Sequence, residues 1–119
     1  MIVKRRGYLE EYLCREAVFL IPVSKLKMTV NEDGQKTTVL ELVINFLDKN
    51  YGGSWHEPPR VKGRYKGLPD GLYRKFQISF VGKHRIPKLK RFLGSLAKQI
   101  GEESIYTGTG EDFWAIYPP

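Results

Sequence analysis

Short apolar segments separated by polar turns define the elements expected in the first third of the chain. Residues 17–21 (Ala-Val-Phe-Leu-Ile) are β-prone and end at Pro22, which predicts a central buried strand. Residues 8–13 before it fit either one helical turn or an additional edge segment. Residues 23–36 are mostly polar and contain the turn cluster Asn-Glu-Asp-Gly at 31–34, which indicates a connection or a small hairpin.

Two segments have the apolar spacing of amphipathic helices. Thr38 with Glu41 three residues later is typical of a capping box, and apolar residues continue on one helical face, so we predict a helix at 38–50. The same segment is rich in β-branched residues, and a strand is the alternative. Pro87 marks the start of a second helix, which ends at Gly101. Its apolar stripe consists of Leu89, Phe92, Leu93, Leu96 and Ile100.

Two further pairs of segments are predicted to form hairpins. Strands at 61–66 and 72–81 flank the turn 67–71, which contains Pro-Asp-Gly, and strand alternation directs Phe76, Ile78 and Phe80 toward the core. Short strands at 104–107 and 113–117 flank a glycine-containing turn.

Residues 52–59 are predicted to form a loop between the first helix and the first of these strands. Trp55 within this loop either fills the edge of the core or serves as a binding ring.

This order of elements predicts an α+β fold. A strand, a helix, two strands, a helix and a strand form the split βαβ arrangement of ferredoxin-like folds, with two helices on one face of a four-stranded antiparallel sheet and here an extra C-terminal strand. The 119 residues fit a single domain, in which 1–16 form an N-terminal extension and 17–119 the core.

Composition excludes several classes of protein. The single cysteine, Cys14, leaves no disulfide framework and no multi-cysteine zinc site. The longest apolar runs are much shorter than the roughly 20 residues of a membrane span, and no signal-peptide pattern follows the basic start. We therefore expect a cytoplasmic protein that does not bind membranes.

The net charge of +7 is unevenly distributed. Residues 1–30 carry +3, residues 31–57 carry −3, residues 58–98 carry +11, and residues 99–119 carry −4. A basic block of this strength between acidic segments suggests an anionic partner, although a solvated face that only aids solubility has the same composition.

The sheet face not covered by helices is the candidate binding surface. Cations interleaved with phenol rings suit single-stranded nucleic acid or a nucleotide, because rings stack on bases and cations neutralise phosphates. The glycine-aromatic signature of the RNA recognition motif is absent from 72–81. The predicted ligand-binding residues, including two from the second helix, are Lys62, Arg64, Lys66, Tyr73, Lys75, Arg91, Lys98 and Tyr106. Alternatively, the tyrosines have no ligand, or a second subunit covers this face in a homodimer.

Catalytic signals are weak, and we expect neither a catalytic residue nor a metal or other cofactor. The two histidines, His56 and His84, lack the context of known histidine phosphodiesterases. Acidic pairs at 102–103 and 111–112 are the basis of one alternative, a small metal-dependent phosphodiesterase or nuclease. A second alternative is a protein-interaction module that docks on an acidic host protein.

Several short motifs between residues 39 and 117 support a resemblance. They are Tyr-Gly-Gly at 51–53, Lys-Gly-Arg-Tyr at 62–65, Asp-Gly at 70–71 and Gly-Glu-Glu-Ser-Ile-Tyr at 101–106. With these motifs the chain resembles small ferredoxin-like accessory proteins of phages and mobile elements. The resemblance implies an accessory role such as interference with a host defence system, and it carries over no catalytic residue.

Overall fold

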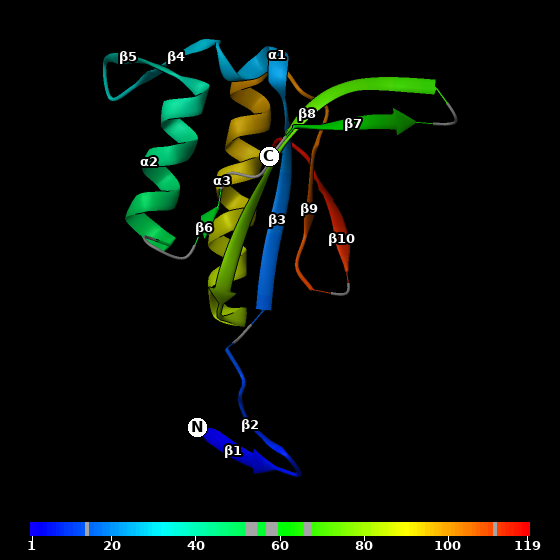
Figure 1. The fold of residues 1–119 in the computed structure, drawn as a ribbon. Helices are drawn as coiled ribbons and strands as arrows, with labels where there is room; N and C mark the ends of the chain where they lie inside the picture. The colour runs from blue at the N-terminus through cyan, green and yellow to red at the C-terminus, as the bar shows by residue number, and fades with distance from the viewer. Residues whose placement is uncertain (14, 52–54, 57–59, 66–67, 111) are drawn as a thin grey trace.

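The computed structural model describes residues 1–13, 15–51, 55–56, 60–65, 68–110 and 112–119; for 56, 60–65, 68–70 and 80 it describes the backbone only. The fold is α+β, with antiparallel sheets and helices (Figure 1). The helices are α1 (Val23–Leu26), α2 (Val39–Tyr51) and α3 (Ile86–Ile100), with a 3₁₀ turn η1 (Lys83–Arg85) before α3. The strands are β1 (Ile2–Arg5), β2 (Tyr8–Glu11), β3 (Arg15–Pro22), β4 (Thr29–Glu32), β5 (Gln35–Thr38), β6 (Trp55–His56), β7 (Arg60–Tyr65), β8 (Leu68–Val81), β9 (Ile105–Gly108) and β10 (Phe113–Ile116).

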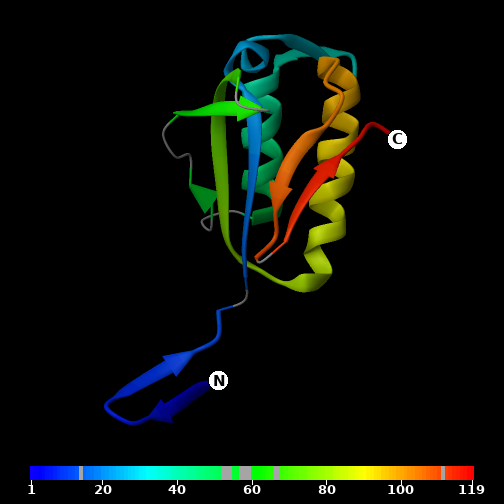
Figure 2. The same cartoon turned by 90° about the vertical axis from the view of Figure 1, so that its right-hand side faces the viewer.

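The main sheet has the strand order β10-β9-β3-β8-β6, and β7 also pairs with β8. The predicted central strand is confirmed, since β3 lies between β9 and β8. The long helices α2 and α3 cover one face of this sheet, and no helix of the described residues lies over the other face (Figures 1 and 2). We call the second face the open face.

The core lies between the sheet and the two long helices. Ala17, Phe19 and Ile21 alternate along β3 and are fully buried, and the ring of Phe19 stacks on that of Phe76 at a centroid distance of 5.1 Å. Phe76 and Ile78 are fully buried, as predicted, whereas the side chain of Phe80 lies outside the described residues. This alternation fixes which residues of the sheet face outward.

The helix predicted at 38–50 is confirmed as α2. The backbone N–H of Glu41 donates to Thr38 Oγ1 at 3.1 Å, so Thr38 is the N-terminal cap. The carboxylate of Glu41 accepts from the hydroxyl of Thr37 at 3.0 Å instead of completing the reciprocal capping box. Because α2 buries Val39, Val43 and its own C-terminal Tyr51 against the core, tertiary packing outweighs the β-branched composition.

The stop of the second helix at Gly101 is also confirmed. Gly101 has φ +70°, its N–H donates to the carbonyl of Lys98, and the N–H of Glu102 donates to the carbonyl of Ala97 at 2.9 Å. This is a Schellman motif, which uses glycine because a left-handed conformation is unfavourable for a residue with a Cβ. The motif turns the chain from α3 toward β9.

Two predicted connections are wrong in detail. The turn expected at 67–71 is not there, because β8 already begins at Leu68 and Tyr65 pairs with Leu68. A shift in pairing follows Gly63, and it leaves Asp70 without a direct partner on β7. In the loop expected at 52–59, residues 55–56 form strand β6, which pairs with Ile78 and Gln77 of β8.

The segments outside the main sheet form two hairpins. Residues 23–36 contain α1 and the hairpin β4–β5, as the polar composition indicated. Residues 8–11 are strand β2, which pairs with β1 in a separate sheet rather than forming a helical turn. This N-terminal hairpin projects away from the rest of the molecule (Figures 1 and 2), and the side chains of 1–13 are exposed except for the half-buried Val3.

Candidate binding surfaces

The register of the strands determines which predicted ligand residues share the open face. In β8, Tyr73 pairs with Pro22 and Lys75 pairs with Leu20, both of which face away from the core. Tyr106 of β9 lies on the same face, because its neighbour Thr107 pairs with the inward-facing Phe19. Tyr73, Lys75 and Tyr106 therefore lie on one face, as predicted.

The other predicted sheet cations do not join them. Lys62 pairs with Leu72, one position away from Tyr73, so the register assigns the Lys62 position to the opposite face of the sheet. Arg64 comes after the shift in pairing and is opposite Pro69, so the register of Tyr73 does not assign it to a face, and Lys66 lies outside the described residues. Among the predicted sheet cations whose side chains the structure describes, Lys75 is the one on the open face.

Among the side chains that the structure describes, aromatic rings are the main feature of the open face. Tyr106 is 41% exposed, Phe113 68% and Tyr117 60%. The ring of Phe113 lies over Gly108, where an added Cβ would come within 2.9 Å of it. Near the other edge, Gln77 donates to Glu16 at 2.6 Å. This surface suits stacking and apolar contacts more than phosphate binding.

A basic stripe runs along the outer surface of α3. We define it as Lys88, Arg91 and Lys98, all of them exposed, and the last two were predicted as ligand residues. Their spacing puts them within one side of the helix over about 15 Å of its length. None of the three forms an ion pair with another described residue. Residues 83–100 contain six Lys or Arg and no Asp or Glu, so no acidic side chain of the helix itself opposes them.

A groove between α2 and α3 borders this stripe. Its floor is the parallel ring pair Phe46–Phe92, with centroids 3.8 Å apart, and Leu42 lies beside them. One part of the groove has a volume of about 670 Å³ and extends under the β4–β5 hairpin. The adjoining part, about 490 Å³, includes Lys88 and Arg91 in its wall. The volume is within the range of small-molecule and nucleotide sites.

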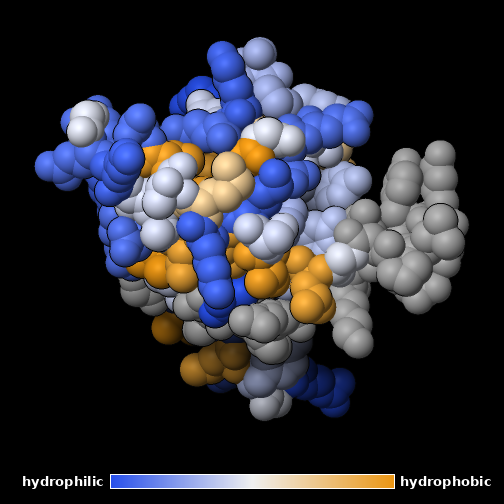
Figure 3. Space-filling view, turned by 90° about the horizontal axis from the view of Figure 1, so that it is seen from above, coloured by the Kyte–Doolittle hydropathy of each residue, from blue (hydrophilic) through white to orange (hydrophobic). Residues whose placement is uncertain are grey.

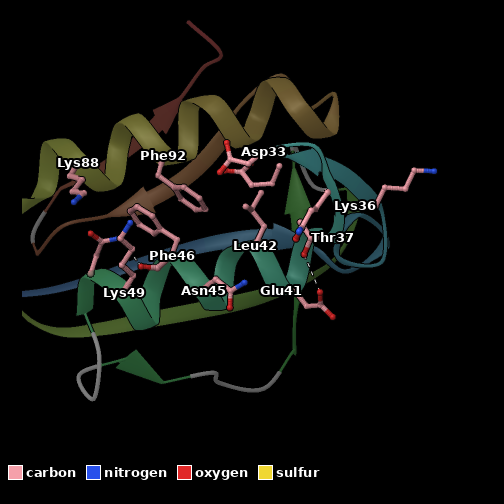
Figure 4. Close-up of a pocket in the computed structure, with 13 residues that line it drawn as sticks. Asp33, Lys36, Thr37, Glu41, Leu42, Asn45, Phe46, Lys49, Lys88 and Phe92 are labelled. Carbon is pink, nitrogen blue, oxygen red and sulfur yellow. Dashed lines mark hydrogen bonds between the residues drawn. The ribbon is translucent and has the colours of Figure 1, made fainter.

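The two ends of the groove differ in charge (Figure 4). Lys49 of α2 and Lys88 of α3 lie at one end, beside the phenylalanine rings. Asp33 and Glu41 lie at the other end, where the hairpin meets the start of α2. Glu32 also lines the groove, and Lys36 lies at the hairpin end with its side chain pointing away from the groove. Seen from the end of the molecule that carries α1 and the hairpin, the surface is mostly hydrophilic, with separate hydrophobic areas between the polar ones (Figure 3). An anion is therefore favoured at the Lys88 end of the groove.

Tyr51 joins the ends of the two helices. Its hydroxyl donates to the carbonyl of Arg85 at 3.2 Å, and the Arg85 guanidinium lies 4.6 Å from the centre of its ring. Burial raises the pKa of Tyr51, and the charge of Arg85 partly opposes this rise. These contacts fix the start of α3, and thereby the position of the basic stripe, relative to α2.

The residues proposed for metal catalysis are not brought together. Glu103 precedes β9 and Asp112 precedes β10, so the two carboxylates lie at opposite ends of a hairpin whose strands are about 13 Å long. In the described part of the chain, no three His, Cys, Asp or Glu residues gather as a metal site would require. Glu111, Cys14 and the side chain of His56 lie outside the described residues.

Trp55 fills the edge of the core. It packs against the buried cluster, and its indole Nε1 donates to Asp48 Oδ1 at 2.8 Å. Of the two alternatives for this residue, the packing role is the observed one.

No helix among the described residues has the length and apolar character needed to span a membrane.

Sequence reasoning missed the groove as a site. Phe92 was expected in the apolar stripe of the second helix, and Phe46 lies on the apolar face of α2, but both are only partly buried because the hairpin leaves a hollow above them. The spacing between Lys88 and Arg91 predicts that both lie on the solvent-exposed side of α3. This spacing was the sequence signal for the cationic wall of the groove. The turn cluster at 31–34 indicated a connection or a small hairpin, but the position of β4–β5 beside the groove had no local sequence signature.

Comparison of this chain with protein-family models, with curated proteins and with solved structures gave no match.

Proposed function

We propose that this protein is a non-enzymatic binding protein for nucleic acid, and that the phosphates contact the basic stripe of α3. The observation that carries the proposal is the stripe of three exposed cations on a segment with no acidic residue. Phosphate contacts of this kind supply most of the affinity of sequence-independent nucleic-acid binding.

The groove beside the stripe favours a single strand over a duplex. Lys88 and Arg91 lie in the wall of the same hollow as Phe92. A backbone phosphate at the rim leaves an unstacked base free to enter the groove, where aromatic and polar side chains are exposed. A base paired in a duplex does not have this freedom. The nucleic-acid interface is thus proposed on the helical side of the sheet, whereas the sequence predicted it on the open face.

We further propose that the fold is ferredoxin-like. The order β9-β3-β8-β7 within the sheet, with α2 after β3 and α3 after β8, supports this assignment, and β10 is the extra strand. The implied accessory role against a host defence system, the cytoplasmic location and the homodimer remain predictions.

Fluorescence anisotropy with a labelled single-stranded RNA or DNA oligonucleotide tests the proposal. Three phosphate contacts predict a slope of log K against log salt of about −2 for a single strand, which is roughly a 20-fold loss of affinity from 50 to 200 mM salt. The triple variant Lys88→Ala/Arg91→Ala/Lys98→Ala is expected to lose most of this binding and most of the slope.

A matched control removes the same charges elsewhere. Lys4→Ala/Arg6→Ala/Lys27→Ala also replaces two exposed lysines and one exposed arginine, but on the N-terminal hairpin and after α1. If net charge alone drives binding, both triple variants weaken it equally and the proposal is wrong. Equal affinity for a poly-glutamate chain of the same charge contradicts it too, and favours an acidic protein partner.

A further inference from the structure

The groove beside the basic stripe has ends of different chemistry along α3. In its part of about 490 Å³, Lys88 and Arg91 line one end, and Ser95 and Gln99 of the same helix line the other. The side chains of these four residues are all described. From Lys88 to Gln99 the helix is about 16 Å long, because each residue adds 1.5 Å. A ligand that lies along this groove therefore meets cations at one end and uncharged hydrogen-bonding groups at the other.

Glu32 of β4 adds a carboxylate at the end of the groove away from these cations. It lines both parts of the groove, so it lies where the two parts adjoin. It precedes Asp33 on the hairpin, which lies at the end opposite Lys88 (Figure 4). The Glu32 side chain is exposed, and its carboxylate forms no ion pair or hydrogen bond with another described residue. Both of its oxygens are available to a ligand.

The floor of the groove between its two ends is apolar. Leu42, Phe46 and Phe92 are partly buried against the core, and all three line both parts of the groove. A nucleobase covers apolar surface with its rings and keeps its hydrogen-bonding groups at its edge. Cations, an apolar floor and a carboxylate therefore follow one another along the groove in the order of the phosphate, the rings and the edge donors of a nucleotide.

We propose that this groove selects a guanine base of the bound single strand, with the Glu32 carboxylate accepting from guanine N1–H and from the amino group on C2. A phosphate of the strand stays at Lys88 and Arg91, where the charge of the groove favours it. Guanine selection rests on the proposed function, because the α3 stripe holds the backbone whose base enters the groove.

Guanine is the base whose donors match a carboxylate. Its Watson–Crick edge carries two adjacent donors, which the two carboxylate oxygens accept in a charge-assisted pair. Adenine and cytosine have one amino group beside a ring nitrogen that accepts, and thymine and uracil have one N–H between two carbonyls. With those bases one oxygen of Glu32 faces another acceptor, and this repulsion adds to the selectivity.

Fluorescence anisotropy of the full chain with labelled oligothymidylates tests this selection. One central thymine is replaced in turn by guanine, adenine, cytosine or hypoxanthine, which is guanine without the amino group on C2. The guanine oligonucleotide is expected to bind about tenfold more tightly than the all-thymine one, because a bidentate pair discriminates between bases at this level. Hypoxanthine is expected to fall between the two. Equal affinities for guanine and thymine overturn the proposal, as does a preference for adenine, cytosine or hypoxanthine over guanine.

Glu32→Gln tests the contact itself. It is expected to lower the ratio of guanine to thymine affinity from about tenfold to less than about twofold, because an amide offers one acceptor and turns a donor toward the other guanine donor. The lost negative charge acts on both oligonucleotides alike and cancels in the ratio. Retained binding of the thymine oligonucleotide shows that the variant is folded.

Glu41→Gln is the matched control. It removes the same charge at the same end of the groove, but the Glu41 side chain points away from the phenylalanine rings and accepts from the Thr37 hydroxyl at 3.0 Å (Figure 4). This variant is expected to keep the guanine preference. An unchanged ratio in Glu32→Gln, or an equal fall of the ratio in both variants, contradicts the contact between Glu32 and guanine.

The guanine preference and nucleic-acid binding can be told apart when they fail. If the chain binds every oligonucleotide equally and with the expected salt dependence, the proposed function holds and the guanine site is wrong. If no oligonucleotide binds at low salt, both are wrong. The triple variant of the α3 stripe is expected to weaken binding of every oligonucleotide, whereas Glu32→Gln is expected to reduce only the preference among them.

Discussion

The two sides of the main sheet differ in the chemistry that they present to solvent. The helical side carries the cations of α3 and a groove with a phenylalanine floor. The open face carries tyrosine rings and a hollow with two glutamates in its wall. The exposed cations of α3 and the tyrosines of the open face, which the sequence suggested as parts of one surface, lie on different sides of the main sheet.

This difference shows how strongly strand pairing decides the composition of a surface. Phe76 and Ile78 of β8 face the core, and Lys62 of β7 pairs with Leu72, which has the same parity along β8. Alternation within one strand shows which of its residues share a face of the sheet. Only the pairing between two strands shows which residues of the neighbouring strand lie on that same face. Four variants test the separation of the two surfaces.

A substitution in the core between the sheet and the helices is expected to destabilise the parts of the fold that carry both surfaces. Phe76→Ala takes away a fully buried ring that stacks on Phe19 between the sheet and the helices. The free energy of unfolding is expected to fall by about 3–5 kcal/mol. Urea denaturation measures this change. Phe113→Ala, which removes a ring that is 68% exposed, is the control and is expected to lower the free energy by less than about 1 kcal/mol. An equal decrease in the free energy of unfolding in Phe76→Ala and Phe113→Ala would contradict the burial of Phe76 in the core.

A substitution on α3 is expected to disturb the open face without affecting the stripe. A Cβ at Gly94 would lie 3.2 Å from the carbonyl oxygen of Tyr117, so Gly94→Leu must displace the C-terminal segment. We expect about 1–3 kcal/mol of destabilisation, with oligonucleotide binding retained. Gly94→Ala is the milder control, because its single methyl group needs only a small shift. Unchanged Tyr117 resonances in Gly94→Leu contradict this prediction.

The junction between the helices is expected to respond to pH. Tyr51→Phe removes the hydrogen bond to the Arg85 carbonyl and is expected to lower the free energy of unfolding by about 1 kcal/mol at neutral pH. Because burial raises the pKa of Tyr51 in the folded state, its neutral form stabilises the protein below pH about 10, and this stability is lost as the pH rises through the folded-state value.

Urea unfolding at pH 8 and pH 11 measures the Tyr51 effect. The loss of stability between the two pH values is expected to be smaller in Tyr51→Phe than in the parent protein, since other titrating groups are common to both. A larger loss in the variant contradicts the assigned direction of the pKa shift.

Deleting residues 1–13 is expected to have the smallest effect. The N-terminal hairpin has almost wholly exposed side chains and pairs only within itself in the described sheets. Isolated two-stranded hairpins are marginally stable in water, so its removal is expected to change the unfolding free energy of the remainder by less than about 0.5 kcal/mol. Thermal unfolding of the truncated chain measures this effect. A clear decrease in its midpoint temperature would indicate that residues 1–13 pack against the rest of the molecule, which contradicts the prediction.

Local signals in the sequence were sufficient for most of the fold. The apolar run at 17–21, the cap at Thr38 and the stop at Gly101 each depend on nearby residues, and each prediction is confirmed. The hairpin turn was predicted wrongly, because Pro69-Asp70-Gly71 is a strong turn signal that the structure instead accommodates within β8 beside a bulge.

The candidate site was predictable only in part. Arg91 and Lys98 were assigned to the exposed side of α3 because helical periodicity is a local property. The positions of Lys62 and Arg64 depended on pairing between two strands, and the acidic hollow depended on three segments meeting at Tyr73, Tyr106 and Tyr117. Neither depends on local sequence, so tertiary structure was required.

The strand order also sets when the sheet can assemble during synthesis. The central strand β3 is made early, yet Val18 pairs with Gln77 on one side and with Gly108 on the other, both much later in the chain. Pairings so distant in sequence slow folding, because a long loop must close before either edge of β3 is satisfied. At translation rates of about 5–20 residues per second, β3 therefore waits for several seconds with Phe19 unburied and both its edges open, which makes it the segment that most needs protection from aggregation on the ribosome.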